Sequence, residues 1–321
     1  MELGLFTPVF AKLSFTELLK ELRRYPEITS LELGTGAFPG ASHIDVEALL
    51  ASRDAAREYL QRLQDAGLSI SALSCHGNPV HPVQELADRD DAIFRRTVQL
   101  AERLHAPVVV TFSGCPGGSP ADRTPNWITT AWPPEYQQAL AWQWEQRLIP
   151  YWQQAAAFAS DHGIRVALEA HPGFCVYNPE TLLSLRAEAG PSLGINLDPS
   201  HLWWQGMDIP QVIAELADAI FHVHAKDVAL APARIAQNGV LDAKSYLDMK
   251  RRSWIFRSVG WGHSELEWKA IVSTLRLAGY DGVLSIEHED ALLSTHEGLR
   301  SAIALLTRIL PSEPPVEAWW A

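Results

Sequence analysis

Short apolar runs alternate with longer, helix-type segments along almost the whole chain. The runs lie at residues 3–7, 30–34, 68–75, 107–112, 166–169, 194–198, 220–227 and 283–287. Helical periodicity is clearest at residues 45–66, 90–104, 136–161 and 266–277. Eight strand–helix units in about 300 residues predict a parallel (β/α)8 TIM barrel, an α/β fold. A doubly wound open sheet is the alternative, but the first strand is not followed by a glycine-rich phosphate loop.

Two long irregular segments interrupt the alternation. Residues 113–134 are rich in proline and glycine and contain Trp127 and Trp132, and loops of this length in a compact domain are often lids. Residues 229–262 form a second insertion. We therefore expect a single barrel over residues 1–310 with these two insertions.

A proline-rich tail follows at residues 311–321 and carries Trp319 and Trp320 near its end. An apolar pair of this kind is costly in water, so we expect it to be buried against the barrel or a second subunit. The second arrangement is favoured, which predicts a homo-oligomer.

Composition limits the partners and the compartment. The chain has 321 residues, 47% of them hydrophobic, and a formal net charge of −12, so we expect a sizeable core and no nucleic-acid partner. Its three cysteines form no C-x-x-C pair, which favours a reducing compartment. The start resembles no signal peptide, and no apolar run approaches the roughly 18 residues that span a bilayer. We therefore expect a cytoplasmic protein with no membrane segment.

Ligand-type side chains stand at the ends of four predicted strands. They are Glu169, Asp198, His224 and Glu287. The C-terminal ends of barrel strands meet on one face, so these side chains are expected to bind one divalent metal ion. Three oxygen ligands and one nitrogen ligand suit Mn²⁺, Mg²⁺ or Co²⁺ and tolerate Zn²⁺, and Mn²⁺ is our first choice.

The run at residues 220–227 places His222, His224 and Lys226 on one strand face. A polar face on a barrel strand indicates a strand that borders a polar site. Taken alone, the run fits a pair of structural histidines equally well. Lys226 could bind substrate, or form a buried ion pair with an acidic neighbour such as Asp227.

The segments around these ligands carry a family resemblance. Glu169, Asp198-Pro199-Ser200-His201, His224-Ala225-Lys226-Asp227 and Glu287 resemble the metal-ligand strands of the xylose isomerase-like barrel superfamily of sugar isomerases and epimerases. Residues 74–79, 125–134 and 238–242 are similar to the subgroup that acts on 3-keto-glycosides. That subgroup includes 4-epimerases and the catalytic subunits of C-glycoside deglycosidases, so it implies a carbohydrate or glycoside substrate. A deglycosidase would also imply a small partner subunit.

A sugar carbonyl and a neighbouring hydroxyl that chelate a divalent ion have an acidified C–H bond between them, because the metal stabilises the enediolate. In members that epimerise, the resemblance assigns the proton exchange to the glutamates matching Glu169 and Glu287. His201 and His76 are candidates to hold or protonate substrate oxygens, and the alternative for each is structural support. The remaining substrate-binding candidates are Trp127, Trp132 and Arg257. Weaker candidates are Glu32, His171, His222, His288 and Glu289.

These observations favour a metal-dependent sugar epimerase or isomerase. A 3-keto-glycoside lyase, which would expel the C1 substituent by β-elimination, would have the same site. An apurinic-site endonuclease needs a multi-metal cluster and a basic surface, which the net charge of −12 disfavours. A non-catalytic partner protein would have little reason to keep all four ligands.

Overall fold

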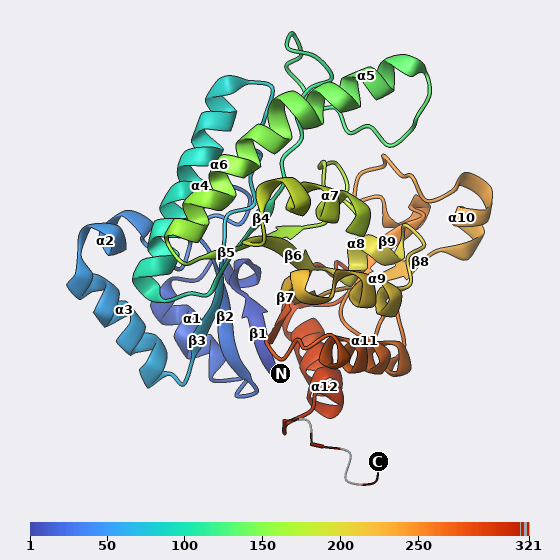
Figure 1. Cartoon of the computed structure of the whole chain (residues 1–321). Coiled ribbons are helices and arrows are strands. Elements are labelled where there is room, and N and C mark those ends of the chain that lie inside the picture. The colour runs from blue at the N-terminus through green and yellow to red at the C-terminus, as the bar shows by residue number, and fades with distance from the viewer. Residues whose placement is uncertain (315, 318–319, 321) are drawn as a thin grey trace.

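The computed structural model describes residues 1–314, 316, 317 and 320. Its barrel strands are β1 (Glu2–Phe6), β2 (Ile28–Gly34), β3 (Ser69–Ser74), β4 (Val108–Phe112), β5 (Arg165–Glu169), β6 (Leu193–Leu197), β7 (Ile220–Ala225) and β10 (Val283–Ile286). They pair in parallel and close in the order β1-β10-β7-β6-β5-β4-β3-β2 (Figure 1). The closed ring confirms the predicted (β/α)8 barrel.

Helices surround the ring of strands (Figure 1). They are α1 (Phe15–Leu22), α2 (Val46–Ala51), α3 (Arg53–Asp65), α4 (Gln84–Leu104), α5 (Pro134–Gln143), α6 (Ile149–Asp161), α7 (Pro179–Ala189), α8 (Pro199–Trp203), α9 (Ile209–Leu216), α10 (Pro232–Asn238), α11 (Glu265–Leu277) and α12 (Thr295–Ile309). A π-helical turn, Trp144–Leu148, joins α5 to α6, and 3-10 turns lie at Thr7–Phe10, Ala217–Ala219 and Met249–Arg251.

Local sequence explains where several helices begin. A serine and a glutamate three residues later form a capping box at the starts of α1, α11 and α12. Residues 45–66 were expected to form one helix, but they form α2 and α3. Ser52 has extended backbone angles (φ −129°, ψ 118°), and its side chain accepts a hydrogen bond from the Ala55 N–H. The serine therefore ends one helix and caps the next.

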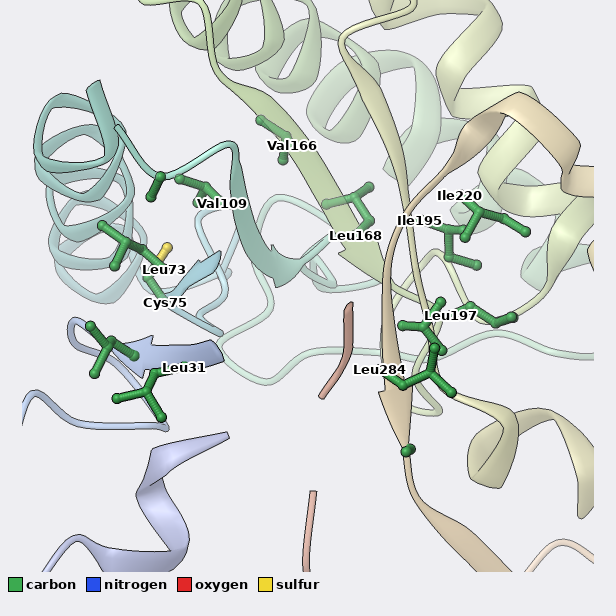
Figure 2. Close-up of a cluster of buried hydrophobic side chains, with 14 of the residues drawn as sticks. Leu31, Leu73, Cys75, Val109, Val166, Leu168, Ile195, Leu197, Ile220 and Leu284 are labelled. Carbon is green, nitrogen blue, oxygen red and sulfur yellow. The ribbon is translucent and has the colours of Figure 1, made fainter. Parts of the chain in front are cut away.

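Strand residues alternate between the two sides of the barrel wall. Leu31, Leu73, Val109 and Leu168 belong to the main apolar core (Figure 2). A separate small cluster is made by Ala72, Val108, Val110, Ala167 and Phe221. Buried polar side chains also lie on the barrel strands, among them Glu32, Asn196, His222, His224 and Ser285. Barrel interiors are usually filled by branched apolar residues, so this polar layer needs a functional explanation.

The two insertions differ in structure. Residues 113–133, all of them described, contain neither helix nor strand. The second insertion contains an antiparallel hairpin of β8 (Asp227–Leu230) and β9 (Trp254–Arg257), with α10 between its strands. Because β7 ends at Ala225, the strand expected at residues 220–227 is divided between the barrel and this hairpin.

Two further expectations concern membranes and the tail. Among the described residues, helices long and apolar enough to cross a bilayer are absent. Trp319 lies outside the described residues together with Pro315, Ala318 and Ala321, and so does the burial expected of it. Trp320 is described and is 70% exposed, so the burial expected against the barrel is not found for this residue.

Candidate metal centre and active site

The four expected ligands meet at the C-terminal ends of β5, β6, β7 and β10. Glu169 ends β5, Asp198 follows β6, His224 stands near the end of β7, and Glu287 follows β10. Each offers one ligand atom within 4.8 Å of the other three. The His224 Nδ1 atom is 3.3 Å from Glu169 Oε2 and 3.0 Å from Glu287 Oε2. Barrel closure thus brings together residues more than a hundred positions apart.

Unpaired atoms in this cluster fit a cation. Asp198 Oδ2, His224 Nδ1 and Glu287 Oε2 are buried and have no hydrogen-bond partner among the described residues. The Lys226 ammonium is 3.0 Å from Asp198 Oδ2 and 2.8 Å from Glu287 Oε2, but these contacts do not have hydrogen-bond geometry. Leaving a buried polar atom unpaired costs about 1–3 kcal/mol, which coordination would offset. The residues therefore fit a divalent ion of the kind that carboxylates and imidazole bind.

Glu169 is surrounded by hydrogen-bond donors. His76 Nε2 and Asn196 Nδ2 each lie 3.1 Å from its Oε2 atom, and His201 Nε2 lies 3.2 Å from its Oε1 atom. Burial opposes ionisation, but hydrogen bonds from His201, His224 and His76 outweigh it and hold the Glu169 pKa well below its usual value. The carboxylate is therefore ionised and ready to bind a cation or accept a proton.

Lys226 lies on the other side of the cluster. Its Nζ atom contacts Asp198 and Glu287, and it is 3.2 Å from Glu289 Oε2. Burial lowers the Lys226 pKa, but the charges of Asp198 and Glu287 outweigh this and raise it well above its usual value. Burial likewise raises the Glu287 pKa, and the charges of Lys226 and His224 reverse this and lower it to about 2. Lys226 is thus a permanent cation beside Glu287.

Lys226 does form a buried ion pair, the alternative to substrate binding, but with Asp198 and Glu287 and not with Asp227. Asp227 Oδ2 accepts the backbone N–H groups of Gly260, Gly262 and His263. Gly262 is needed because a Cβ atom there would lie 2.2 Å from the Val228 carbonyl oxygen. Asp227 therefore fixes the connection between β9 and α11.

A cavity of about 430 Å³ opens over the cluster. It is lined by Phe6, Pro8, Val9, Phe38, Pro39, His76, Phe112, Glu169, His171, Phe174, Lys226, Glu287, His288 and Glu289. Phe112 and Phe174 stack in its wall with their ring centroids 4.1 Å apart, and Phe112 lies edge-on to His76 at 4.6 Å. A ligand in this cavity therefore meets both charged groups and aromatic rings.

The expected substrate-binding residues divide into two groups. His76 and Lys226 line the cavity, and His201 is fully buried beside Glu169 and Asp198. Trp127, Trp132 and Arg257 are not brought to the cluster. Trp127 lines a separate hollow of about 620 Å³ with Trp144 and Tyr177. Trp132 is 76% exposed and is not among the described residues that line either cavity.

Arg257 also lies outside the set that lines the cavity. Its Nε atom donates to Asp290 Oδ2 at 2.9 Å, and the same oxygen accepts the Ser258 N–H. Arg257 thus supports the turn after β9, and its expected role in substrate binding stays a prediction.

Several site residues were not singled out from the sequence. Asn196 is two residues before Asp198 and shares its strand face, a spacing that could have indicated it. Phe38, Phe112 and Phe174 each follow or end a strand, but a phenylalanine in that position is usually part of a core, so the pattern gave no specific signal.

Comparison with known proteins places the chain in a family. The family model described as xylose isomerase-like TIM barrel matches residues 29–309. The chain belongs to the xylose isomerase-like TIM-barrel family. The uncharacterized protein YfiH of Bacillus subtilis (strain 168) is 38% identical over 313 residues, which cover 97% of this chain and 99% of that protein.

Solved structures of other proteins share this fold. A D-tagatose 3-epimerase-like protein is 19% identical, with a TM-score of 0.63 over 96% of this chain and 98% of its own. The IOLI protein, solved with a zinc atom, is 18% identical, with a TM-score of 0.64 over 97% of this chain and 98% of its own. At these identities the likeness supports the barrel fold.

Proposed function

We propose that this family member is a divalent-metal-dependent epimerase or isomerase of a keto-sugar or 3-keto-glycoside. The observation that carries the proposal is the placement of Glu169 and Glu287. Both carboxylates line one cavity and flank His224 Nδ1, yet they come from β5 and β10, which β6 and β7 separate in the barrel. Two bases on different sides of one ligand are what inversion at a carbon atom requires.

A divalent ion held by Glu169, Asp198, His224 and Glu287 would polarise a sugar carbonyl and stabilise the negative charge formed on its oxygen. Glu169 then removes the proton from the neighbouring carbon on one face. Glu287 takes up a proton from water and delivers it to the other face, and Glu169 then releases its proton to water. The roles exchange in the reverse direction. The zinc atom in the IOLI structure and the epimerase-like neighbour support this assignment. Mn²⁺ remains our first choice for the ion.

Other residues orient the substrate. Lys226 is a fixed cation at the cavity, so it can hold a substrate oxygen that carries negative charge. His76 hydrogen-bonds Glu169 and lines the cavity, so it can contact a hydroxyl group next to the reacting carbon. His201 touches Glu169 and Asp198 and keeps both oriented toward the ion.

One observation favours a second candidate, a 3-keto-glycoside lyase. The aromatic wall of Phe112 and Phe174, together with Phe38 at the cavity, could accept an apolar aglycone. Proton removal beside the 3-keto group would then expel the C1 substituent. The same bases would serve both reactions.

The experiment that tests the proposal follows deuterium. The Mn²⁺-loaded protein is incubated in D2O with free keto-sugars and with aryl 3-keto-glucosides, and products are analysed by NMR. An epimerase or isomerase incorporates deuterium beside the carbonyl and leaves the glycosidic bond intact. Release of the phenol would identify the lyase. Absence of deuterium and of phenol with the whole panel would contradict both.

A further inference from the structure

A second buried carboxylate lies directly behind the ligand cluster. Glu32, in the middle of β2, is fully buried, and its carboxylate touches both histidines of β7. His224 Nε2 is 3.0 Å from Oε1 and 2.9 Å from Oε2, and His222 Nε2 is 2.9 Å from Oε2. The hydroxyl groups of Ser285, at 2.7 Å, and of Ser74 donate to it as well. One carboxylate is thus hydrogen-bonded to four side chains, which come from three other strands.

The ionised form of Glu32 is stabilised by this surrounding. Its two oxygens meet two imidazole nitrogens and two serine hydroxyl groups, and such partners suit the ionised form. An unpaired buried charge would be strongly destabilising, whereas this one is fully hydrogen-bonded.

His224 uses its two ring nitrogens differently. Its Nε2 atom meets Glu32, whereas its Nδ1 atom points to Glu169 and Glu287 and is unpaired among the described side chains. A neutral imidazole carries one proton, and a carboxylate partner draws that proton to the nearer nitrogen. With the proton on Nε2, the lone pair of Nδ1 is free for an ion.

The ring of His224 is also fixed in orientation. The Phe6 ring stacks on it with centroids 5.3 Å apart and an interplanar angle of 26°. Ser285 is the residue of β10 that pairs in register with His224, and it also donates to Glu32. The paired strands β7 and β10 therefore both contact Glu32, β7 through His224 and β10 through Ser285.

We propose that Glu32 is a positioning residue for the metal centre, which selects the Nε2–H tautomer of His224 and thereby increases the affinity of Nδ1 for the ion. The inference rests on the proposed ion site, but it does not depend on the reaction or the substrate. Carboxylates behind a metal-binding histidine commonly change the metal affinity by about 10–100-fold.

The same geometry has a rival explanation. Glu32, His222 and His224 offer ligand atoms close enough to hold an ion of their own. The hydroxyl groups of Ser74 and Ser285 disfavour a second ion at this place, because they already donate to the Glu32 oxygens that such an ion would need. The two accounts differ in the number of ions bound per chain.

The test measures Zn²⁺ affinity by competition with a chromogenic chelator. We expect Glu32→Gln, which keeps the side-chain volume, to weaken Zn²⁺ binding by about 10–100-fold. The matched control is Asp242→Asn, since Asp242 also has a fully buried carboxylate but its partners, Lys244 and Ser253, lie in the second insertion. The control should bind Zn²⁺ as the wild type does. An affinity of the folded Glu32→Gln variant within twofold of the wild type would overturn the proposal.

A second measurement needs no variant. In the Zn²⁺-loaded wild type, the ¹⁵N shifts of His224 should show a protonated Nε2 and a metal-bound Nδ1. A metal-bound Nε2, or two Zn²⁺ ions per chain, would refute the positioning role. If no sugar is turned over but these binding results hold, the proposed reaction fails and the role of Glu32 stands.

Discussion

The ligand cluster and the 113–133 segment are both at the C-terminal side of the barrel, yet they are held in different ways. In the cluster, each side chain is in contact with residues from several strands, as Lys226 is with Asp198 and Glu287. In the 113–133 segment, Trp132 is largely exposed and Trp127 lies against a hollow of its own. Barrel closure fixes strand ends, whereas it does not determine where an insertion places its side chains.

The largest effect should follow from changing a glutamate of the cluster. We expect Glu169→Gln to keep the fold and to lower kcat/KM by about 10²–10⁴-fold, because an amide cannot accept the proton. In D2O it should still label the epimer whose C–H bond faces Glu287, and Glu287→Gln should label the other one. Circular dichroism checks the fold, and NMR of the two labelled epimers checks the roles. Equal labelling of both epimers by either variant would contradict the two-base assignment.

A smaller but still large effect is expected for stability when the buried cation is removed. Lys226→Met leaves Asp198 and Glu287 without their ammonium, so the metal-free protein should lose about 3–5 kcal/mol of unfolding free energy. Saturating Mn²⁺ should recover most of this loss, because the ion supplies the missing positive charge. Urea unfolding with and without Mn²⁺ measures both values.

The control for Lys226 is Lys244→Met, which removes a partly exposed partner of Asp242. Asp242 keeps its hydrogen bonds from the backbone N–H groups of Lys244 and Ser253 in this variant, and the lost ammonium is partly exposed, so the variant should change little, by about 0–1 kcal/mol. A loss in Lys226→Met that Mn²⁺ does not reduce would show that the lysine serves packing alone.

Trp127 should affect stability more than substrate binding. Its ring meets Tyr177 edge-on, with centroids 5.5 Å apart, and packs beside Trp204 and Trp254. Because it is only partly buried, we expect Trp127→Ala to lose roughly 2–3 kcal/mol, less than the ~3–5 kcal/mol of a fully buried tryptophan. KM should stay unchanged. A raised KM with unchanged thermal stability would restore the earlier expectation that this residue closes over the substrate.

The smallest effect is expected for Trp132. Its side chain is exposed, so Trp132→Ala should change the unfolding free energy by no more than about 0.5 kcal/mol and leave KM as it is. Thermal unfolding and steady-state kinetics check this together. A clear rise in KM would show that the segment moves onto the cavity when substrate binds.

The sequence was informative where regular structure decides position. Glu169, Asp198, His224 and Glu287 end successive parallel strands, and parallel strands of a barrel bring their ends together. The same argument gave the barrel itself, because strand–helix alternation is a periodic pattern that local residues encode.

Contacts across the barrel were harder to predict. Glu32 interrupts an apolar strand, and His222 and His224 alternate on β7, so the sequence indicated that polar side chains lie on these strands. It did not indicate that Glu32 pairs with the two histidines, because the pairing joins positions 190 or more residues apart. Lys226 had Asp227 as its nearest acidic neighbour in sequence, yet the hairpin turns Asp227 toward Gly260 and Gly262. Such choices depend on the packing of the whole chain.

The most direct test of this account is the metal content of Asp198→Ala beside that of the wild type, measured by elemental analysis after dialysis against Mn²⁺ and removal of free ion. Asp198 Oδ2 is buried and unpaired among the described residues, so the carboxylate should be essential for coordination. We predict one ion per chain in the wild type and little or none in the folded variant. Full occupancy in Asp198→Ala would contradict the metal centre on which the proposed function depends.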